Sequence, residues 1–266
     1  MDIVVCIKQV PDTTDVKIDP KTGTLIREGV PSIINPDDKH AIEAALKLKE
    51  AHGGSVTVIS MGPPQADDAM REALAMGVDD AILLCDRAFA GADTLATSYT
   101  LATCVKKIEK YDLVICGRQA IDGDTAQIGP QMAEYLGLPQ VTYVKNLEVG
   151  QDGKTVKLER ALEDGYEKVE TTLPALLTVI KDLNEPRYPS VRGIVEALNE
   201  REVKVWTAAD IGAEEDRIGL NGSPTTVKRT FSPEPKGEGE IIEGTVEEMV
   251  QGLIQRLKDK NVIREI

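Results

Sequence analysis

Four short apolar runs separated by helical patterns constrain the fold of this chain more than any other feature. The runs lie at residues 3–7, 56–60, 81–85 and 113–116. Uninterrupted runs of this length suit strands that are buried on both faces of a parallel sheet. Helical patterns fill the intervals at residues 37–51, 65–76 and 94–110. This alternation predicts a doubly wound, mostly parallel α/β structure over about residues 1–140.

The pattern changes near residue 141. The segments "VGQDGKT" and "LEDGYEK" place Asp-Gly between β-prone stretches, which is typical of hairpins. We therefore expect residues 142–149, 155–162, 166–173 and 175–181 to form an antiparallel meander, so that about 141–181 extend the sheet. The stretch "DLNEPRYPSVRG" follows at 182–193, and its two prolines predict an irregular segment. Together these segments predict one α/β domain over residues 1–218.

The last part of the chain, residues 219–266, is predicted to be an arm that ends in a helix. It begins with "GLNGSPTTVKRTFSPEPKGEGE", which is rich in Gly, Pro and Ser and suits a flexible tether. A helix is expected at residues 245–260, with one apolar stripe. The stripe consists of Val246, Met249, Val250, Leu253, Ile254 and Leu257. This stripe needs a surface to cover it, either on the chain's own sheet or on another chain.

Composition excludes several classes of function. The formal net charge is −14 and the isoelectric point is about 4.7, which argues against nucleic acid or an anionic membrane as the main partner. No stretch approaches the roughly 18 apolar residues of a membrane span. The first ten residues carry no basic region before their apolar run, so we expect a strand and no signal peptide. With no Cys-x-x-Cys pair, the four cysteines are expected to be buried thiols of a cytoplasmic protein.

The glycine-rich segment "GRQAIDGDTAQIGPQ", residues 117–131, is the strongest candidate for ligand binding. Ligands of open α/β sheets lie beyond the carboxyl ends of the strands, and four segments meet there: 8–15, 61–64, 86–93 and 117–129. Bare amides before a helix can bind phosphate, and Thr125 adds a hydroxyl. An alternative needs no ligand: Asp124 caps a helix with Gln127 in its first turn, and Pro130 then kinks that helix.

A second candidate segment, "NPDDK", opens a helix near residue 35. We expect Asn35 to be the N-cap and Pro36 the first helical residue. Asp37 and Asp38 already satisfy that helix end and would repel a phosphate, so ribose hydroxyls or an adenine amino group suit it better. The sequence contains neither the GxGxxG fingerprint nor a P-loop. With two histidines in the chain, we expect no histidine-rich metal site and no Ser-His-Asp triad.

Five segments together resemble the beta subunit of electron-transferring flavoprotein. They are "CIKQVPDT", "NPDDKHAIEAALKLKE", "SMGPPQADDAMREALAMG", "GRQAIDGDTAQIGPQ" and "DLNEPRYPSVRG", in that order. The resemblance implies a Rossmann-like fold, a heterodimer with an FAD-bearing alpha subunit, and electron transfer between dehydrogenases. It implies that an adenine nucleotide is bound by Cys6, Asn35, Pro36, Asp37, Asp38, Met61, Gly117, Arg118, Gln119, Ala120, Ile121, Asp122, Gly123, Asp124, Thr125, Ala126, Gln127 and Ile128.

The family contains two styles, and the resemblance favours one of them. Respiratory members hold AMP in the beta subunit, whereas bifurcating members hold a second FAD. That FAD takes electrons from NADH and divides them between a low-potential acceptor, ferredoxin or flavodoxin, and an acyl-CoA or hydroxy-acid dehydrogenase. Gly123 and Ala126 stand where respiratory relatives tend to carry an acid and a bulkier polar residue, so FAD is expected and AMP is the alternative. A departure is Ala161, which stands where respiratory relatives often carry Glu.

The segment 182–193 is expected to dock the acceptor dehydrogenase. It carries residue types that are enriched at contact hot spots, and the resemblance implies an apolar anchor at Val191. The expected docking residues are Glu185, Pro186, Arg187, Tyr188, Val191 and Arg192. We expect no catalytic residue in this chain, because NADH oxidation would require the complex with the alpha subunit. A non-redox AMP-binding regulatory protein remains open, whereas a free-standing NAD-dependent dehydrogenase is disfavoured.

Overall fold

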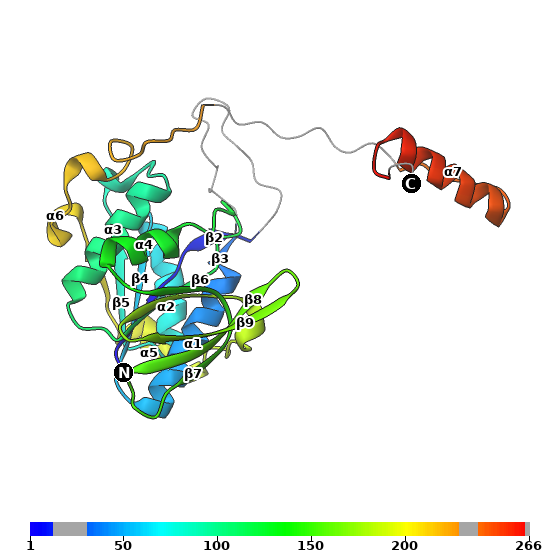
Figure 1. Cartoon of the computed structure of the whole chain (residues 1–266). Helices are drawn as coiled ribbons and strands as arrows, with labels where there is room; N and C mark the ends of the chain where they lie inside the picture. The colour runs from blue at the N-terminus through cyan, green and yellow to red at the C-terminus, as the bar shows by residue number, and fades with distance from the viewer. Residues whose placement is uncertain (13–30, 229–238, 264–266) are drawn as a thin grey trace. The chain divides into compact units, whose positions relative to one another are not determined.

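The computed structural model describes residues 1–12, 31–228 and 239–263, which belong to two compact units (Figure 1). The first unit is Met1–Lys228 and the second is Arg229–Ile266. The first unit therefore extends ten residues beyond the predicted domain end at residue 218.

A nine-stranded sheet forms the centre of the first unit within the described residues. Its order is β11-β5-β4-β1-β6-β10-β7-β8-β9. The strands from β11 to β7 are parallel, and β7, β8 and β9 are antiparallel. Their bounds are β1 Ile3–Cys6, β4 Val56–Met61, β5 Asp80–Leu84, β6 Leu113–Gly117, β7 Gln140–Val149, β8 Thr155–Leu162, β9 Gly165–Thr172, β10 Ala175–Val179 and β11 Val203–Trp206. A separate two-stranded ribbon pairs β2 Gln9–Pro11 with β3 Ser32–Ile34.

Helices cover both faces of this sheet (Figure 1). One face packs against α1 Pro36–His52, α2 Asp67–Met76 and α5 Val191–Asn199. The other face packs against α3 Thr94–Ile108, α4 Ile128–Leu136 and α6 Ala208–Ile211. Short 3-10 helices lie at Pro64–Ala66, Arg87–Phe89, Lys181–Leu183 and Glu215–Arg217. The predicted doubly wound α/β fold with an antiparallel extension is confirmed.

The strand order reverses between β1 and β6. From β1 the chain proceeds through α1 to β4 on one side, whereas β6 is followed on its other side by β10. The two strands are in parallel register, with Cys6 opposite Cys116. Ligand sites of doubly wound sheets lie at such a reversal, because the loops there diverge to opposite faces. The reversal therefore brings together the chain that follows Cys6 and the chain that follows Gly117.

One predicted strand pairing is wrong. Residues 175–181 were expected to end the antiparallel meander, but β10 lies between β6 and β7 and is parallel to both. All five residues of β10 are buried. Burial on both faces is characteristic of an interior parallel strand, and the apolar sequence "ALLTV" meets that requirement. The hairpins β7–β8 and β8–β9 form as predicted.

The prediction of an irregular segment at 182–193 is correct only for its middle. A 3-10 helix occupies Lys181–Leu183, and α5 begins at Val191. Ser190 is the N-cap, and its hydroxyl accepts a hydrogen bond from the Gly193 amide at 2.9 Å. Both prolines precede this cap, so they do not interrupt the helix. Three elements, α5, β11 and α6, were not predicted from the sequence.

The second unit contains α7, Val246–Asp259, close to the predicted bounds. Thr245 and Glu248 form a reciprocal capping box at its start. Four residues of the predicted stripe, Val246, Val250, Leu253 and Ile254, are exposed. Met249 and Leu257 are half-buried, so the stripe is mostly, but not entirely, exposed. Among the helices that the structure describes, none combines the length and apolar character needed to cross a membrane.

Leu176→Ala should reveal the interior position of β10. Leu176 lies on β10 and is fully buried on the sheet face that α3 and α4 cover. Its truncation to alanine leaves a cavity, which should lower the unfolding free energy by about 2–5 kcal/mol. Leu162→Ala is the matched control, because Leu162 is exposed on β8 and should cost less than about 1 kcal/mol. Urea denaturation of both variants measures the difference. Equal, small losses would contradict an interior β10.

Candidate functional site

The side chain of Asn35 joins the two predicted nucleotide segments. Asn35 is the N-cap of α1, as predicted, but its side chain makes no capping hydrogen bond. Its Nδ2 donates to the carbonyl of Gln119 at 2.9 Å, and its Oδ1 accepts from the Ile121 amide at 3.0 Å. Asn35 is completely buried. The helix start at residue 35 and the glycine-rich loop after β6 are therefore held together by hydrogen bonds of one side chain.

Asp38 lies behind this junction and is also buried. Its carboxylate accepts hydrogen bonds from the Lys8 amide at 2.8 Å and from Asn35 Nδ2 at 3.0 Å. A Cβ on Gly117 would lie 2.1 Å from Asp38 Oδ1, so only glycine permits this approach. Burial raises the pKa of Asp38 to about 7, although hydrogen bonds from Asn35 and Lys8 act in the opposite direction.

The other acidic side chains of the site have partners of their own. Lys8 Nζ contacts Asp122 at 2.6 Å, and Gln119 Nε2 donates to Asp124 Oδ1 at 2.8 Å. Arg118 Nε lies 3.4 Å from Asp37 Oδ2. Burial raises the pKa of Asp37, and the nearby Arg118 charge opposes that shift. No carboxylate of this group is left to face a ligand without a partner.

The backbone of the loop before α4 presents free donors. Asp124 and Ala126 have φ angles of 48° and 53°, so the chain turns through left-handed conformations there. Within the described residues, the amides of Thr125, Ala126 and Gln127 donate no hydrogen bond. Alternating backbone conformations of this kind gather amides into anion-binding concavities. The loop therefore presents amide donors at the segment for which the sequence predicts phosphate binding, and the binding itself stays a prediction.

The alternative capping interpretation of this loop is wrong. Gln127, not Asp124, is the N-cap of α4, and no side chain caps that helix. Pro130 is the third residue of α4, where the amide that proline lacks would have no partner within the helix. Pro130 therefore fits the first turn without the expected kink. The uncapped helix start adds its own free amides and partial positive charge.

Cys6 and Met61 border the site from the ends of β1 and β4. The Cys6 thiol points into the core, where Sγ lies 3.9 Å from Met132 Sδ. A hydrogen bond with Cys116 and burial both raise the pKa of the Cys6 thiol well above its usual range. Both effects favour the neutral thiol over the nucleophilic thiolate. Of the four free cysteines, Cys85 alone is not fully buried.

The two segments together offer donors to a ligand that carries acceptor oxygens. Arg118 Nε is buried and pairs with Asp37 at 3.4 Å, but it makes no hydrogen bond of good geometry among the described residues. It lies in the same loop as the free amides of residues 125–127. Buried donors without partners are rare and costly, so a ligand that supplies acceptor oxygens would satisfy them. The predicted residues of both segments thus lie together at the reversal point of the sheet.

The predicted docking segment is split by the structure into exposed and inward residues. Tyr188 and Val191 are 95% and 81% exposed, and Arg192 is exposed and paired with Glu196 at 2.6 Å. Glu185 is exposed, whereas Pro186 is half-buried. Arg187 turns inward onto α1. The segment therefore displays an aromatic and an apolar side chain, whereas the Arg187 side chain is 32% exposed and its guanidinium is bound to α1.

Sequence reasoning missed the exposed face of α5. Ile194, Val195 and Leu198 are exposed and follow Val191 at helical spacing. The spacing of residues 191, 194, 195 and 198 is a signal that could have predicted this helix. It was obscured by the preceding prolines. The four side chains, here called the α5 face, extend the exposed apolar surface from Val191.

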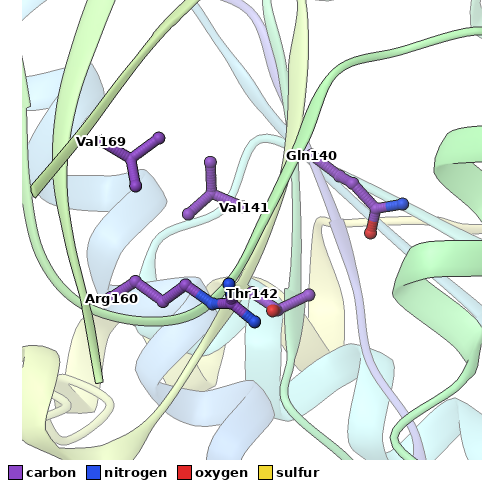
Figure 2. Close-up of a pocket in the computed structure, with 5 residues that line it drawn as sticks. All are labelled: Gln140, Val141, Thr142, Arg160 and Val169. Atoms are coloured by element: carbon purple, nitrogen blue, oxygen red, sulfur yellow. The ribbon is translucent and has the colours of Figure 1, made fainter. Parts of the chain in front are cut away.

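Two cavities lie outside the predicted nucleotide segments. The first, of about 290 Å³, is lined by Gln140, Val141, Thr142, Arg160 and Val169, and Figure 2 shows the guanidinium end of Arg160 beside Thr142. The second, of about 430 Å³, lies between α1 and β7. Arg160 Nε is buried and has no hydrogen-bond partner in the described part of the chain. Residues 1–12, 31–228 and 239–263 assemble no group of three or more metal-ligating side chains.

Asp38→Asn should change how stability depends on pH. The pKa of Asp38 rises from 3.8 in the unfolded chain to about 7 in the folded one, so the folded state holds more protons at this group between these values. The stabilisation from Asp38 is complete below pH 3.8 and is lost as the pH rises through about 7. The unfolding free energy of the wild type relative to Asp38→Asn should therefore fall over this window, by on the order of a few kcal/mol.

Urea titrations at several pH values measure this difference. Asp164→Asn, in the exposed β8–β9 turn, is the matched control and should leave the pH profile unchanged. A difference between wild type and Asp38→Asn that stays constant from pH 4 to pH 8 would refute the assignment.

Comparison with known proteins identifies the family. The family model described as "Electron transfer flavoprotein domain" matches residues 22–211, more than half of the chain. The electron transfer flavoprotein subunit beta of Clostridium acetobutylicum is 61% identical over 263 residues, which cover 99% of this chain and 100% of that protein. The caffeyl-CoA reductase-Etf complex subunit CarD of Acetobacterium woodii is 57% identical over 265 residues, with coverage of 99% and 100%. The acryloyl-CoA reductase electron transfer subunit gamma of Anaerotignum propionicum is 46% identical over 274 residues, again with coverage of 99% and 100%. These matches confirm the resemblance found in the sequence, and the chain belongs to the electron transfer flavoprotein family as a beta subunit.

Proposed function

We propose that this chain is the FAD-binding beta subunit of a bifurcating electron-transferring flavoprotein. In this proposal it forms a heterodimer with an alpha subunit and takes electrons from NADH. The electrons are divided between ferredoxin or flavodoxin and, through the alpha-subunit FAD, a high-potential dehydrogenase. When bound, FAD supplies the change from two-electron to one-electron transfer that this division requires. The protein chain binds and orients the cofactor.

The loop before α4 is the observation that carries the nucleotide part of the proposal. Its free amides at Thr125, Ala126 and Gln127 and the uncapped start of α4 suit phosphate oxygens. Asn35 and Asp38 hold the neighbouring segment, where the sugar and base would lie. This division of one ligand between two segments follows from their charge. The carboxylates near residue 38 disfavour phosphate, whereas the loop amides attract it.

Gly123 supports FAD over AMP. A Cβ built on Gly123 meets no atom within 4 Å, so the loop is open at this position. A pyrophosphate carries more negative charge than one phosphate, and an acid at this position would repel it. AMP bound as a structural group, with no bifurcation, is the alternative. A count of FAD and AMP per purified heterodimer distinguishes the two.

Two of the relatives support a CoA-ester reductase as the acceptor dehydrogenase. Their names place one in a caffeyl-CoA reductase–Etf complex and the other as an electron transfer subunit of acryloyl-CoA reductase. The exposed Tyr188 and Val191, together with the α5 face, would form the docking surface for such a partner. Apolar and aromatic side chains of this kind anchor protein interfaces.

The second unit is proposed to hold the alpha subunit. In α7 the exposed side chains of Val246, Val250 and Leu253 lie on one apolar stripe. Each large side chain that stays in water forgoes roughly 1.5–3 kcal/mol of burial free energy. An amphipathic helix that docks into a groove of another chain recovers this free energy. Of the predicted tether, residues 219–240, the structure assigns 219–228 to the first unit, and 229–238 lie outside the described residues.

Gly123→Asp should weaken FAD binding. The open position accommodates the side chain without strain, so the effect is electrostatic, on the order of 1–3 kcal/mol or about 10- to 100-fold. Gly165→Asp is the matched control, because a Cβ at Gly165 also meets nothing within 4 Å and lies outside the site. FAD retention by the heterodimer after ultrafiltration is the measurement. Equal retention by both variants would show that this loop does not hold the phosphates.

Val191→Ala should slow electron delivery to the acceptor dehydrogenase and leave reduction by NADH intact. Loss of an exposed anchor should raise the KM for the acceptor by roughly 5- to 10-fold. Val205→Ala, also an exposed valine but on the edge strand β11, is the control. Stopped-flow measurement of the two half-reactions separates these effects. Equal losses in both half-reactions would contradict the docking assignment.

A further inference from the structure

We propose that Arg187 is a positioning residue, which clamps the docking segment onto α1 before the acceptor arrives and does not itself contact the acceptor. This inference rests on the proposed docking role of residues 182–193. It differs from the expectation for Arg187 in the sequence analysis, where its residue type indicated a contact at the interface. The partner proposed for Arg187 lies within this chain.

The clamp consists of Arg187 and two carboxylates of α1. Arg187 Nε donates to Glu43 Oε2 at 2.7 Å, and Nη2 donates to Glu43 Oε1 at 3.1 Å. The Arg187 backbone amide also donates to Glu43 Oε2, at 3.1 Å. Nη1 and Nη2 reach Glu50 at 2.5 and 3.2 Å. Every terminal nitrogen of the guanidinium thus donates to α1, in the planar geometry that lysine cannot reproduce.

Burial makes the Glu43 part of the clamp the stronger one. Glu43 is 3% exposed, and the nearest other cation is Lys47, whose Nζ lies 3.8 Å from Glu43 Oε1. A buried carboxylate needs a close, hydrogen-bonded partner, and removal of that partner is costly. Hydrogen bonds to Glu43 and then Glu50 raise the pKa of Arg187. Glu50 is largely exposed, so water screens its share.

A second tie fastens the same segment three residues earlier. Asn184 Nδ2 donates to the His40 carbonyl at 3.0 Å, and His40 Nδ1 lies 2.8 Å from the Asn184 carbonyl. Pro186 lies between the two tied residues and Pro189 follows them, and each proline restricts the backbone φ angle at its position. The segment is therefore bound to α1 through two residue pairs, and the partners in each pair are 144 residues apart in sequence.

A third anchor follows the exposed residues. Ser190 caps α5, and a Cβ on Gly193 would lie 2.3 Å from the Ala75 carbonyl oxygen, so the start of α5 is packed closely on α2. Tyr188 thus lies between the Arg187 clamp and the α5 start, and Val191 is the first residue of α5. Anchors on both sides order these side chains before docking. Ordering in advance lowers the entropy cost of binding.

The test compares Arg187→Gln with Glu43→Gln in the heterodimer, using the acceptor half-reaction. Both variants break the clamp, so each should raise the KM for the acceptor by roughly 3- to 10-fold and change kcat little. The double variant Glu43→Gln/Arg187→Gln should show about the same rise as either single variant, because the two residues act as one unit. Arg187→Gln alone leaves the buried Glu43 carboxylate without its arginine partner and could misfold for that reason. The double variant removes this buried charge, so it keeps the test valid if Arg187→Gln does not fold.

Three controls complete the design. Arg192→Gln makes the same chemical change in the same segment at an exposed arginine that does not touch α1, and it should not loosen residues 184–191. Hydrogen exchange of that peptide should accelerate in Arg187→Gln and Glu43→Gln and stay unchanged in Arg192→Gln and Val191→Ala. Arg187→Lys should raise the KM less than Arg187→Gln does, but it should not reach the wild-type KM. Lysine keeps the positive charge but cannot donate the paired hydrogen bonds of a guanidinium.

Two results would overturn the clamp. One is a rise in KM for Arg187→Gln with none for Glu43→Gln, which would make Arg187 a direct contact. The other is a double variant whose rise in KM equals the combined effect of the two single variants. Failure of the docking proposal looks different: Val191→Ala would then leave the KM unchanged, whatever Arg187→Gln does to hydrogen exchange.

Discussion

The candidate nucleotide site depends on the hydrogen bonds of one buried amide, Asn35. The reversal of strand order at β1 and β6 brings two chain segments to one edge of the sheet, but it does not fix their relative position. Asn35 does so, because it both donates to and accepts from the backbone of the loop after β6. Gly117 permits this close approach by leaving space for Asp38. The loop after β6 is therefore fixed to the start of α1, as the proposed sharing of one ligand between the two segments requires.

Helix α1 is the scaffold that the nucleotide site and the docking segment share. Its first turn carries Asn35 and Asp38, and its later turns carry Glu43 and Glu50, which hold Arg187. An α-helix is rigid along its axis, with a rise of about 1.5 Å per residue, so the two sites have a defined separation. A defined separation suits electron transfer, because the proposed cofactor and the docked acceptor must be positioned relative to each other.

The electrostatics of the site follow from the pairing of its acids. The chain is strongly acidic, yet Asp122 is paired with Lys8, Asp37 lies beside Arg118, and Asp124 accepts from Gln119. Backbone amides, rather than a cluster of free cations, are thus the donors available for phosphate. Amides carry no net charge and are fixed by the backbone, so they favour a ligand of defined shape.

Local patterns in the sequence predicted most of the elements. The apolar runs predicted the first parallel strands, the Asp-Gly turns predicted the hairpins of β7, β8 and β9, and the "NPDDK" start predicted α1, because burial and turn chemistry act over a few residues. The glycine-rich loop was likewise recognisable before its geometry was known. The exposed face of α5 was within reach of the same reasoning.

Beyond the predicted hairpins, only the tertiary structure decided how these elements are paired. The insertion of β10 between β6 and β7, the partners of Asn35 and the inward turn of Arg187 all depend on residues distant in sequence. Asn35 reaches residues 84 and 86 positions away, and Arg187 reaches Glu43 across 144 positions. A side chain such as arginine suits an interface and an internal clamp equally well by its chemistry. Its neighbours are set by the packing of whole helices and strands, which no local pattern specifies.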